Sequence, residues 1–150
     1  MGNTTDTTNA TNATNAATIC GIGHLAMNAR DMEKTLNFYC GVLGLKHAFT
    51  LRDAEGNPWI EYLKVADSNF IELFYPKSDI SLATNSTYNH VCLRVEDIHA
   101  AEKALDGAGW EVDIRPKQGA DANWQMWVRD PDGNRIELMQ ISPDSPQAKA

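Results

Sequence analysis

An internal repeat constrains the fold of this chain more than any other feature of its sequence. The first copy opens with the text GIGHLAMN, and the second opens with YNHVCLR. His24 and His90 are 66 positions apart, as are Asp31 and Asp97. Self-similarity at a fixed offset indicates repeated supersecondary units that bury their apolar faces together.

Each copy predicts a strand, a helix and then three more strands. Asp31 and Asp97 are placed to cap the starts of helices over 32–44 and 98–109, which Gly44 and Gly109 end. The predicted strands cover 22–28, 46–52, 58–66, 69–75, 88–94, 110–115, 123–130 and 134–141. The pattern is βαβββ twice, which is an α+β fold with module one at about 18–76 and module two at about 87–141 within a domain spanning 18–141.

Composition indicates which segments lie outside the domain and which classes of partner are disfavoured. Residues 1–17 almost lack large apolar side chains, which predicts a disordered tail, and residues 142–150 form a second tail. The net charge of −7 and the lack of a basic cluster argue against nucleic acid. No apolar run approaches the roughly 20 residues of a membrane span. Three cysteines without a C-x-x-C pair favour a reduced, cytoplasmic protein.

Each copy also carries one His on its first strand and one Glu on its last strand. These are His24 with Glu72 and His90 with Glu137, and the two glutamates are 65 positions apart. An ionised Glu in an apolar strand loses hydration at a cost of several kcal/mol unless a charge meets it. If the four side chains line one concavity, their donors suit Ni²⁺, Co²⁺, Zn²⁺, Mn²⁺ or Fe²⁺.

Each of these residues taken singly has a simpler interpretation. A His in a strand is more often a hydrogen-bonded core residue than a metal ligand. A Glu in a strand usually faces solvent or pairs with a base, and Arg94 or Arg135 is available here. The common offset on equivalent strands of a duplicated unit favours the metal site.

The sequence resembles the vicinal oxygen chelate superfamily, which includes glyoxalase I, methylmalonyl-CoA epimerase, extradiol dioxygenases and bleomycin resistance proteins. The resemblance covers about residues 19–141 and rests on GIGHLAMNARDMEKTLNFYCGVLGL, FIELF, NHVCLRVEDI and VRDPDGNRIELMQ. It implies two modules that form a cupped, partly open barrel-like sheet around one divalent metal ion. The family's ligand positions fall on His24, Glu72, His90 and Glu137.

The set of two His and two Glu is most similar to glyoxalase I of the bacterial type. That enzyme usually has an Arg four residues after the first His and an Asn four residues after the first Glu, and both contact glutathione. This chain has Asn28 and Pro76 at those positions. The departures make glutathione doubtful as a co-substrate and leave the metal site intact.

The resemblance implies a metal-dependent lyase or isomerase that acts through a metal-bound enediolate on a small substrate with vicinal oxygens. Glu137 is then the expected base, and Glu72 serves the opposite face if the chain is an epimerase or isomerase on a hydroxy-keto or sugar-like substrate. A non-haem iron dioxygenase is disfavoured by Glu72 as a fourth ligand, and a small-molecule binding protein by the complete ligand set. A homodimer is expected, with the metal site within one chain or between two.

Weaker candidates surround these four positions. If the DPDGN turn pairs Asp130 with Asn134, then Trp127 lies opposite Glu137 on the inner face of the sheet. Each tryptophan has core packing as its alternative, and Arg94 has a surface ion pair. His47 and His99 lack a partner at a suitable spacing and are expected to be an exposed strand residue and a helix residue. The candidates for substrate binding are Trp127, Gln125, Arg94, Trp59 and Glu61.

Overall fold

The computed structural model describes residues 21–76 and 88–150, so the predicted tail over 1–17 lies outside the described residues. The first module consists of β1 (His24–Asn28), α1 (Met32–Leu36), η1 (Asn37–Val42), β2 (Lys46–Arg52), β3 (Pro58–Ala66) and β4 (Asn69–Phe74). The second consists of β5 (Val91–Arg94), α2 (Ile98–Gly107), β6 (Val112–Gln118), β7 (Trp124–Arg129) and β8 (Arg135–Gln140), and α3 (Pro146–Lys149) follows it.

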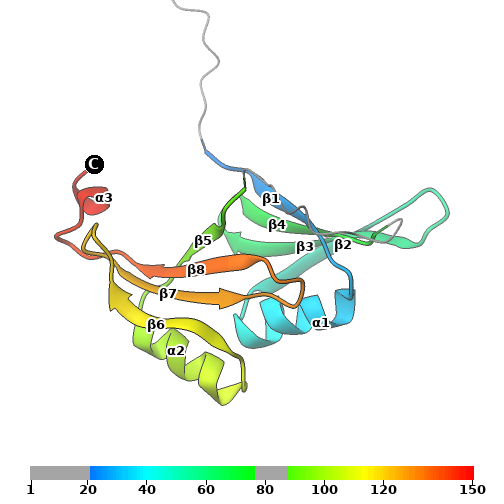
Figure 1. Ribbon diagram of the computed structural model, residues 1–150. Coiled ribbons are helices and arrows are strands. Elements are labelled where there is room, and N and C mark those ends of the chain that lie inside the picture. The colour runs from blue at the N-terminus through cyan, green and yellow to red at the C-terminus, as the bar shows by residue number, and fades with distance from the viewer. Residues whose placement is uncertain (1–20, 77–87) are drawn as a thin grey trace, which may run out of the picture.

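The two modules build two separate four-stranded sheets with the same topology (Figure 1). Their strand orders are β1-β4-β3-β2 and β5-β8-β7-β6. The first strand of each module runs parallel to the last, and the other neighbours are antiparallel. This confirms the α+β fold of two βαβββ modules, and the sheets do not close into a barrel. No helix among the described residues is long and apolar enough to cross a membrane.

The helix boundaries follow the predicted capping residues. The Asp31 carboxylate accepts a hydrogen bond from the Lys34 amide, and Asp97 accepts bonds from two amides at the start of α2. Gly44 and Gly109 follow the helices with φ of +76° and +67°, a conformation that favours glycine. The first helix departs from expectation after Leu36, where it widens into the π-helical turn η1.

The apolar core lies on the helix-covered face of each sheet. In the first module, Ile71 and Leu73 of β4 are buried in one cluster with Phe38 and Tyr39. Ile136 and Leu138 of β8 belong to the same cluster, as do the apolar residues of α2. Because side chains alternate along a strand, the residues between them, which include Glu72, point to the opposite face.

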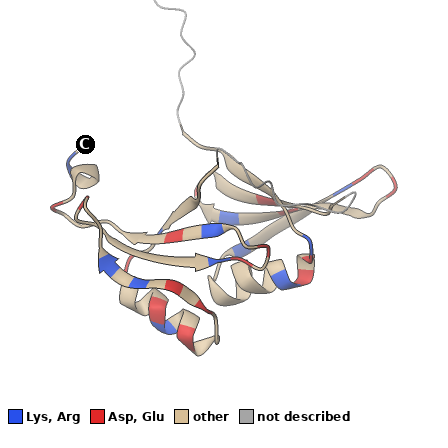
Figure 2. Cartoon of the chain, in the orientation of Figure 1, with Lys and Arg blue, Asp and Glu red and all other residues tan. Residues whose placement is uncertain are grey.

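The modules are joined by the turn between β7 and β8. The Tyr39 hydroxyl donates to Asp130 at 3.0 Å, and the Arg30 Nε donates to Asp132 at 2.9 Å. Both aspartates are buried. Acidic and basic residues occur on both modules (Figure 2). The φ of Gly133 is +86°, as the tight turn requires. The turn is therefore a connection between modules as well as a hairpin.

The C-terminal segment after β8 contains the short helix α3. The Ser145 hydroxyl caps α3 by accepting a bond from the Ala148 amide at 3.1 Å. Asn123, just before β7, accepts a bond from the Ser142 amide at 2.9 Å and donates to Gln147. These side-chain bonds attach the segment to the second module.

Candidate metal centre

The first candidate pair lies across the neighbouring strands β1 and β4. His24 Nδ1 is 3.1 Å from Glu72 Oε1. The Glu72 side chain is 8% exposed, whereas the His24 side chain is 54% exposed. A buried carboxylate thus meets an imidazole that remains accessible from outside the chain.

The second candidate pair repeats this arrangement in the other module. His90, just before β5, has its Nε2 3.2 Å from Glu137 Oε2. The exposed fractions are 31% for the His90 side chain and 9% for Glu137. Both pairs therefore combine one nitrogen donor and one oxygen donor.

One chain does not bring all four donors together. Over residues 21–76 and 88–150, no group of three or more His, Cys, Asp and Glu side chains is arranged to hold a metal ion. Each pair offers two donors, half of a four-coordinate set. The chemistry of the donors fits a divalent metal, and each pair supplies two of the four donors.

An aromatic residue stands opposite each glutamate in the sheet register. Trp127 pairs with Glu137, as the turn geometry predicts, and Tyr62 pairs with Glu72. Tyr62 was not among the sequence candidates, although its offset of 65 positions from Trp127 is the offset of the two glutamates. A hydrogen bond to the Glu72 carboxylate is the main reason that the pKa of Tyr62 is raised.

The other neighbour of each glutamate differs between the modules. Ala26 pairs with Glu72, and Cys92 pairs with Glu137. Partial loss of hydration by the thiol, followed by the negative charge of Glu137, raises the pKa of Cys92 to about 12. The thiol therefore stays protonated at neutral pH and is a hydrogen-bond donor to the carboxylate.

The second module places further polar groups around Glu137. The Trp127 ring packs edge-on against His90, with centroids 4.7 Å apart. The Arg135 Cζ lies 4.4 Å from the centroid of the same ring, so Arg135 covers Trp127 and forms no ion pair with Glu137. Gln125 lies at the register of Met139 and donates to Asp121 at 3.3 Å.

Glu61 does not join this face, in contrast to the expectation from the sequence. It pairs with Leu73, a core residue, and therefore lies on the opposite face from Glu72. The irregularity between His47 and Phe49 in β2 turns both His47 and Thr50 toward Glu61, so His47 has a partner after all. A sequence pattern with strict alternation cannot place these residues.

The Glu61 carboxylate is saturated with donors. His47 Nε2 and Thr50 Oγ1 each lie 2.6 Å from Oε2, and the Tyr75 hydroxyl donates to Oε1 at 2.9 Å. Burial alone raises the pKa of a carboxyl group, but the three donors outweigh it and lower the pKa of Glu61 below its usual value. The group is held as a carboxylate inside the first module.

The other sequence candidates have local surroundings. Trp59 is 39% exposed, with its ring 6.1 Å from that of Phe74. His99 on α2 is 3.6 Å from Glu102, a partner that the sequence spacing did not suggest. The structure thus gives neither residue a contact with a candidate ligand.

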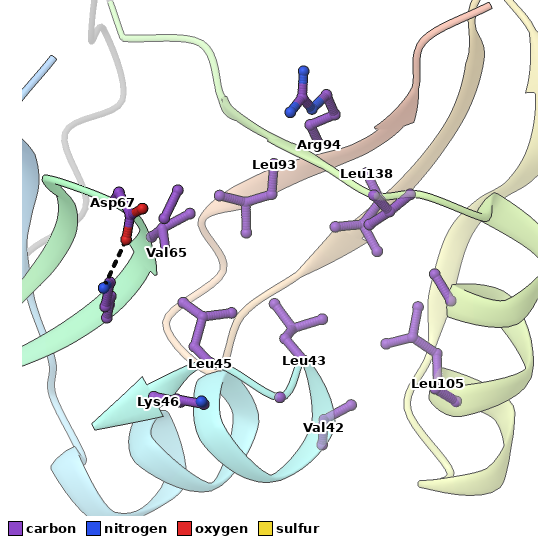
Figure 3. A pocket seen from close by; sticks show the side chains of 16 residues that line it. Val42, Leu43, Leu45, Lys46, Val65, Asp67, Leu93, Arg94, Leu105 and Leu138 are labelled. Carbon is purple, nitrogen blue, oxygen red and sulfur yellow. Dashed lines mark ion pairs between the residues drawn. The ribbon is translucent and has the colours of Figure 1, made fainter. Parts of the chain in front are cut away.

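A separate apolar cavity of about 550 Å³ lies between the modules. Leu43 and Leu45 line it from the first module, and Leu93, Leu105 and Leu138 from the second (Figure 3). Arg94 stands at its margin, with its guanidinium on the side of β5 away from Leu43 (Figure 3). None of the four candidate ligands lines this cavity, so it is distinct from the two pairs.

The fold agrees with comparisons to known proteins. The Glyoxalase/Bleomycin resistance protein/Dioxygenase superfamily matches residues 21–138, and the chain belongs to this superfamily. Lactoylglutathione lyase of Haemophilus influenzae is 27% identical over 122 residues, which are 78% of this chain and 90% of the relative. Lactoylglutathione lyase of Neisseria meningitidis serogroup A is 28% identical over 123 residues, or 78% and 88% of the two chains.

Solved structures support the same fold. A glyoxalase family protein from Enterococcus faecalis superimposes with a TM-score of 0.67 at 25% identity, over 79% of this chain and 96% of the other. Lactoylglutathione lyase from Agrobacterium tumefaciens gives a TM-score of 0.60 at 21% identity, over 80% and 92% of the chains. The resemblance inferred from the sequence motifs is thereby confirmed.

Proposed function

We propose that this chain is a divalent-metal-dependent lyase or isomerase that moves a proton between adjacent carbons of a small substrate with neighbouring oxygens. The observation that carries the proposal is the pair of His–Glu contacts at equivalent positions of the two modules. Relatives named lactoylglutathione lyase support the class of reaction. In the proposed reaction one carbon is oxidised and its neighbour is reduced within the same substrate molecule, so no external oxidant or reductant is needed.

Charge balance supports a divalent cation. Two neutral imidazoles and two carboxylates carry a total charge of −2, which one divalent ion neutralises. Glu72 and Glu137 are both buried, and an unpaired buried carboxylate is strongly disfavoured. We propose Ni²⁺, Co²⁺, Zn²⁺, Mn²⁺ or Fe²⁺ as the occupant, held by His24, Glu72, His90 and Glu137.

We propose that two chains share each site in a homodimer. The His24–Glu72 pair of one copy would meet the His90–Glu137 pair of the other, and two-fold symmetry would create two such sites. This arrangement accounts for the separation of the pairs within one chain. It also gives the exposed His24 imidazole a role.

In the proposed reaction, the protein residues position and move the proton. A bound metal ion would supply Lewis acidity that favours loss of a proton next to a carbonyl group. Glu137 is the proposed base, and Cys92 and His90 orient its carboxylate. Glu72 is equally buried and has its own partners in His24 and Tyr62, which favours it as a second base on the opposite face.

The second base makes an epimerase or isomerase a specific alternative. A one-base lyase needs one carboxylate to carry the proton, whereas inversion at carbon uses a group on each face. Asn28 and Pro76, which stand in place of the usual glutathione contacts, favour a hydroxy-keto or sugar-like substrate for this alternative.

The test is turnover by protein stripped of metal and reloaded separately with each candidate ion. The substrates are the methylglyoxal–glutathione hemithioacetal and a panel of hydroxy-keto compounds. We expect activity that is absent without metal and is lost in Glu137→Gln. Glu61→Gln is the matched control, because Glu61 lies on the other face of its sheet. Full activity in Glu137→Gln would assign the base to another residue.

A further inference from the structure

The two unpaired guanidinium groups of the described chain are Arg94 and Arg135, and both lie on the Glu137 face. Arg30, Arg115 and Arg129 each meet a carboxylate at 2.8–2.9 Å, and Arg52 donates to a backbone carbonyl. Over residues 21–76 and 88–150, neither Arg94 nor Arg135 forms an ion pair. The chain has 20 acidic and 13 basic residues, so a shortage of carboxylates does not explain why these two arginines form no ion pair.

Arg135 is the better placed of the two. It is half-buried and precedes Glu137 by two residues on β8, so both side chains share one face. Its guanidinium lies 4.4 Å from the centroid of Trp127. Stacking on an aromatic ring restrains the group before any ligand arrives, which reduces the entropy lost on binding.

Packing alone does not account for the charge at this position. The equivalent residue of the first module, 65 positions earlier, is Phe70. Its ring lies 6.2 Å from that of Tyr62, which is the counterpart of Trp127. An apolar side chain therefore covers the aromatic residue beside Glu72, and the second module has a cation in the corresponding place.

We propose that Arg135 determines substrate specificity by binding an anionic oxygen group of the substrate. The planar guanidinium presents a fork of N–H donors that matches the two oxygens of a carboxylate or a phosphate ester. The substrate class is then a small hydroxycarbonyl compound that carries such a group close to its reacting carbons. The assignment to a substrate rests on the proposed function, whereas the binding of the anion can be measured without it.

The experiment uses the metal-free protein and follows the indole N–H signal of Trp127 by NMR, identified by its loss in Trp127→Phe. The probes are glycolate, glycerol 3-phosphate and uncharged glycerol. We expect saturable shifts with the anions and none with glycerol. The anion that binds more tightly distinguishes the carboxylate from the phosphate ester as the ligand group.

Substitution provides the decisive comparison. Arg135→Met should weaken anion binding by at least about tenfold, the loss typical of a charged hydrogen bond. Arg129→Met is the matched control, because Arg129 pairs with Arg135 in the register but is held by Asp113. If Arg135→Met does not fold, Arg135→Gln makes the same comparison. Unchanged anion binding in a folded Arg135 variant, or equal binding of glycerol, would overturn the proposal.

The readout is independent of catalysis. Arg135-dependent anion binding in a protein that turns over none of the substrates would refute the proposed lyase and leave the anion site standing. If turnover of charged and uncharged substrates alike is insensitive to Arg135→Met, the role of Arg135 in substrate specificity is refuted and the proposed lyase stands.

Discussion

The Tyr39 hydroxyl donates a 3.0 Å hydrogen bond to Asp130, although the two residues are 91 positions apart. Tyr39 is fully buried, and Asp130 is 5% exposed. Burial is the main cause of the raised pKa of Tyr39, and the charge of Asp130 adds to it. The hydroxyl therefore stays protonated at neutral pH and donates to Asp130, and the bond ties the first helix to the last hairpin.

Removing this hydroxyl should weaken the whole domain. Tyr39→Phe leaves the buried Asp130 carboxylate with one donor fewer, and we expect the free energy of unfolding to fall by about 1–3 kcal/mol. Urea unfolding at pH 7 measures the change. In the background of Asp130→Asn, the same substitution should have a much smaller effect, because the charged acceptor is already gone. Equal losses in both backgrounds would show that the bond contributes nothing specific.

The proposed sharing of each metal site between two chains predicts complementation between two inactive variants. His24→Ala and His90→Ala should each fail to bind metal, because every site of either homodimer lacks one ligand. When the two are unfolded, mixed and refolded together, half of the dimers contain both chains, and one of their two sites is intact. Bound metal should recover to about a quarter of the wild-type amount. No recovery would contradict a site that is shared between two chains.

Metal should stabilise the folded protein through the same residues. With Ni²⁺ or Zn²⁺ at about 100 times its Kd, the gain in unfolding free energy should be about 2.7 kcal/mol. Thermal unfolding with and without the ion measures it. Glu72→Gln should abolish most of the gain, while Glu61→Gln should keep it, since Glu61 is engaged by His47, Thr50 and Tyr75. If Glu61→Gln loses the stabilisation by metal and Glu72→Gln keeps it, the assignment of Glu72 as a ligand is wrong.

The lowered pKa of Glu61 predicts a specific contribution to acid stability. The folded-state pKa lies below the ordinary value of 4.5, so the carboxylate stabilises the fold above that pH. The contribution is lost as the pH falls through the folded-state pKa. The stability difference between the wild type and Glu61→Gln should therefore be constant near neutrality and shrink below about pH 4.5. Urea unfolding across this range measures the difference, and one that grows on acidification would contradict the assignment.

The repeat made most of the fold predictable. Alternation and turn chemistry located the strands, and short-range capping located the helix starts at Asp31 and Asp97. The pairing of Trp127 with Glu137 follows from the geometry of a single tight turn. These features depend on neighbours in sequence, which is why a sequence pattern is enough to find them.

The missed features depend on interruptions of that regularity. The irregularity in β2 placed His47 and Thr50 on one side, and the widened turn after Leu36 has no signature in the apolar pattern. Tyr62 was detectable from the repeat offset but lacks a motif of its own. Whether two modules of one chain face each other depends on packing between them, which no strand pattern encodes.

The contact of Arg30 and Tyr39 with Asp132 and Asp130 also has a consequence for biosynthesis. A chain is made from its N-terminus, and its early segments begin to fold before the late ones exist. Until the final hairpin leaves the ribosome, the Tyr39 hydroxyl therefore lacks Asp130 as its acceptor. Deletion of about the last twenty residues would therefore remove a hydrogen-bond partner from the first module, the part of the chain that is synthesised first.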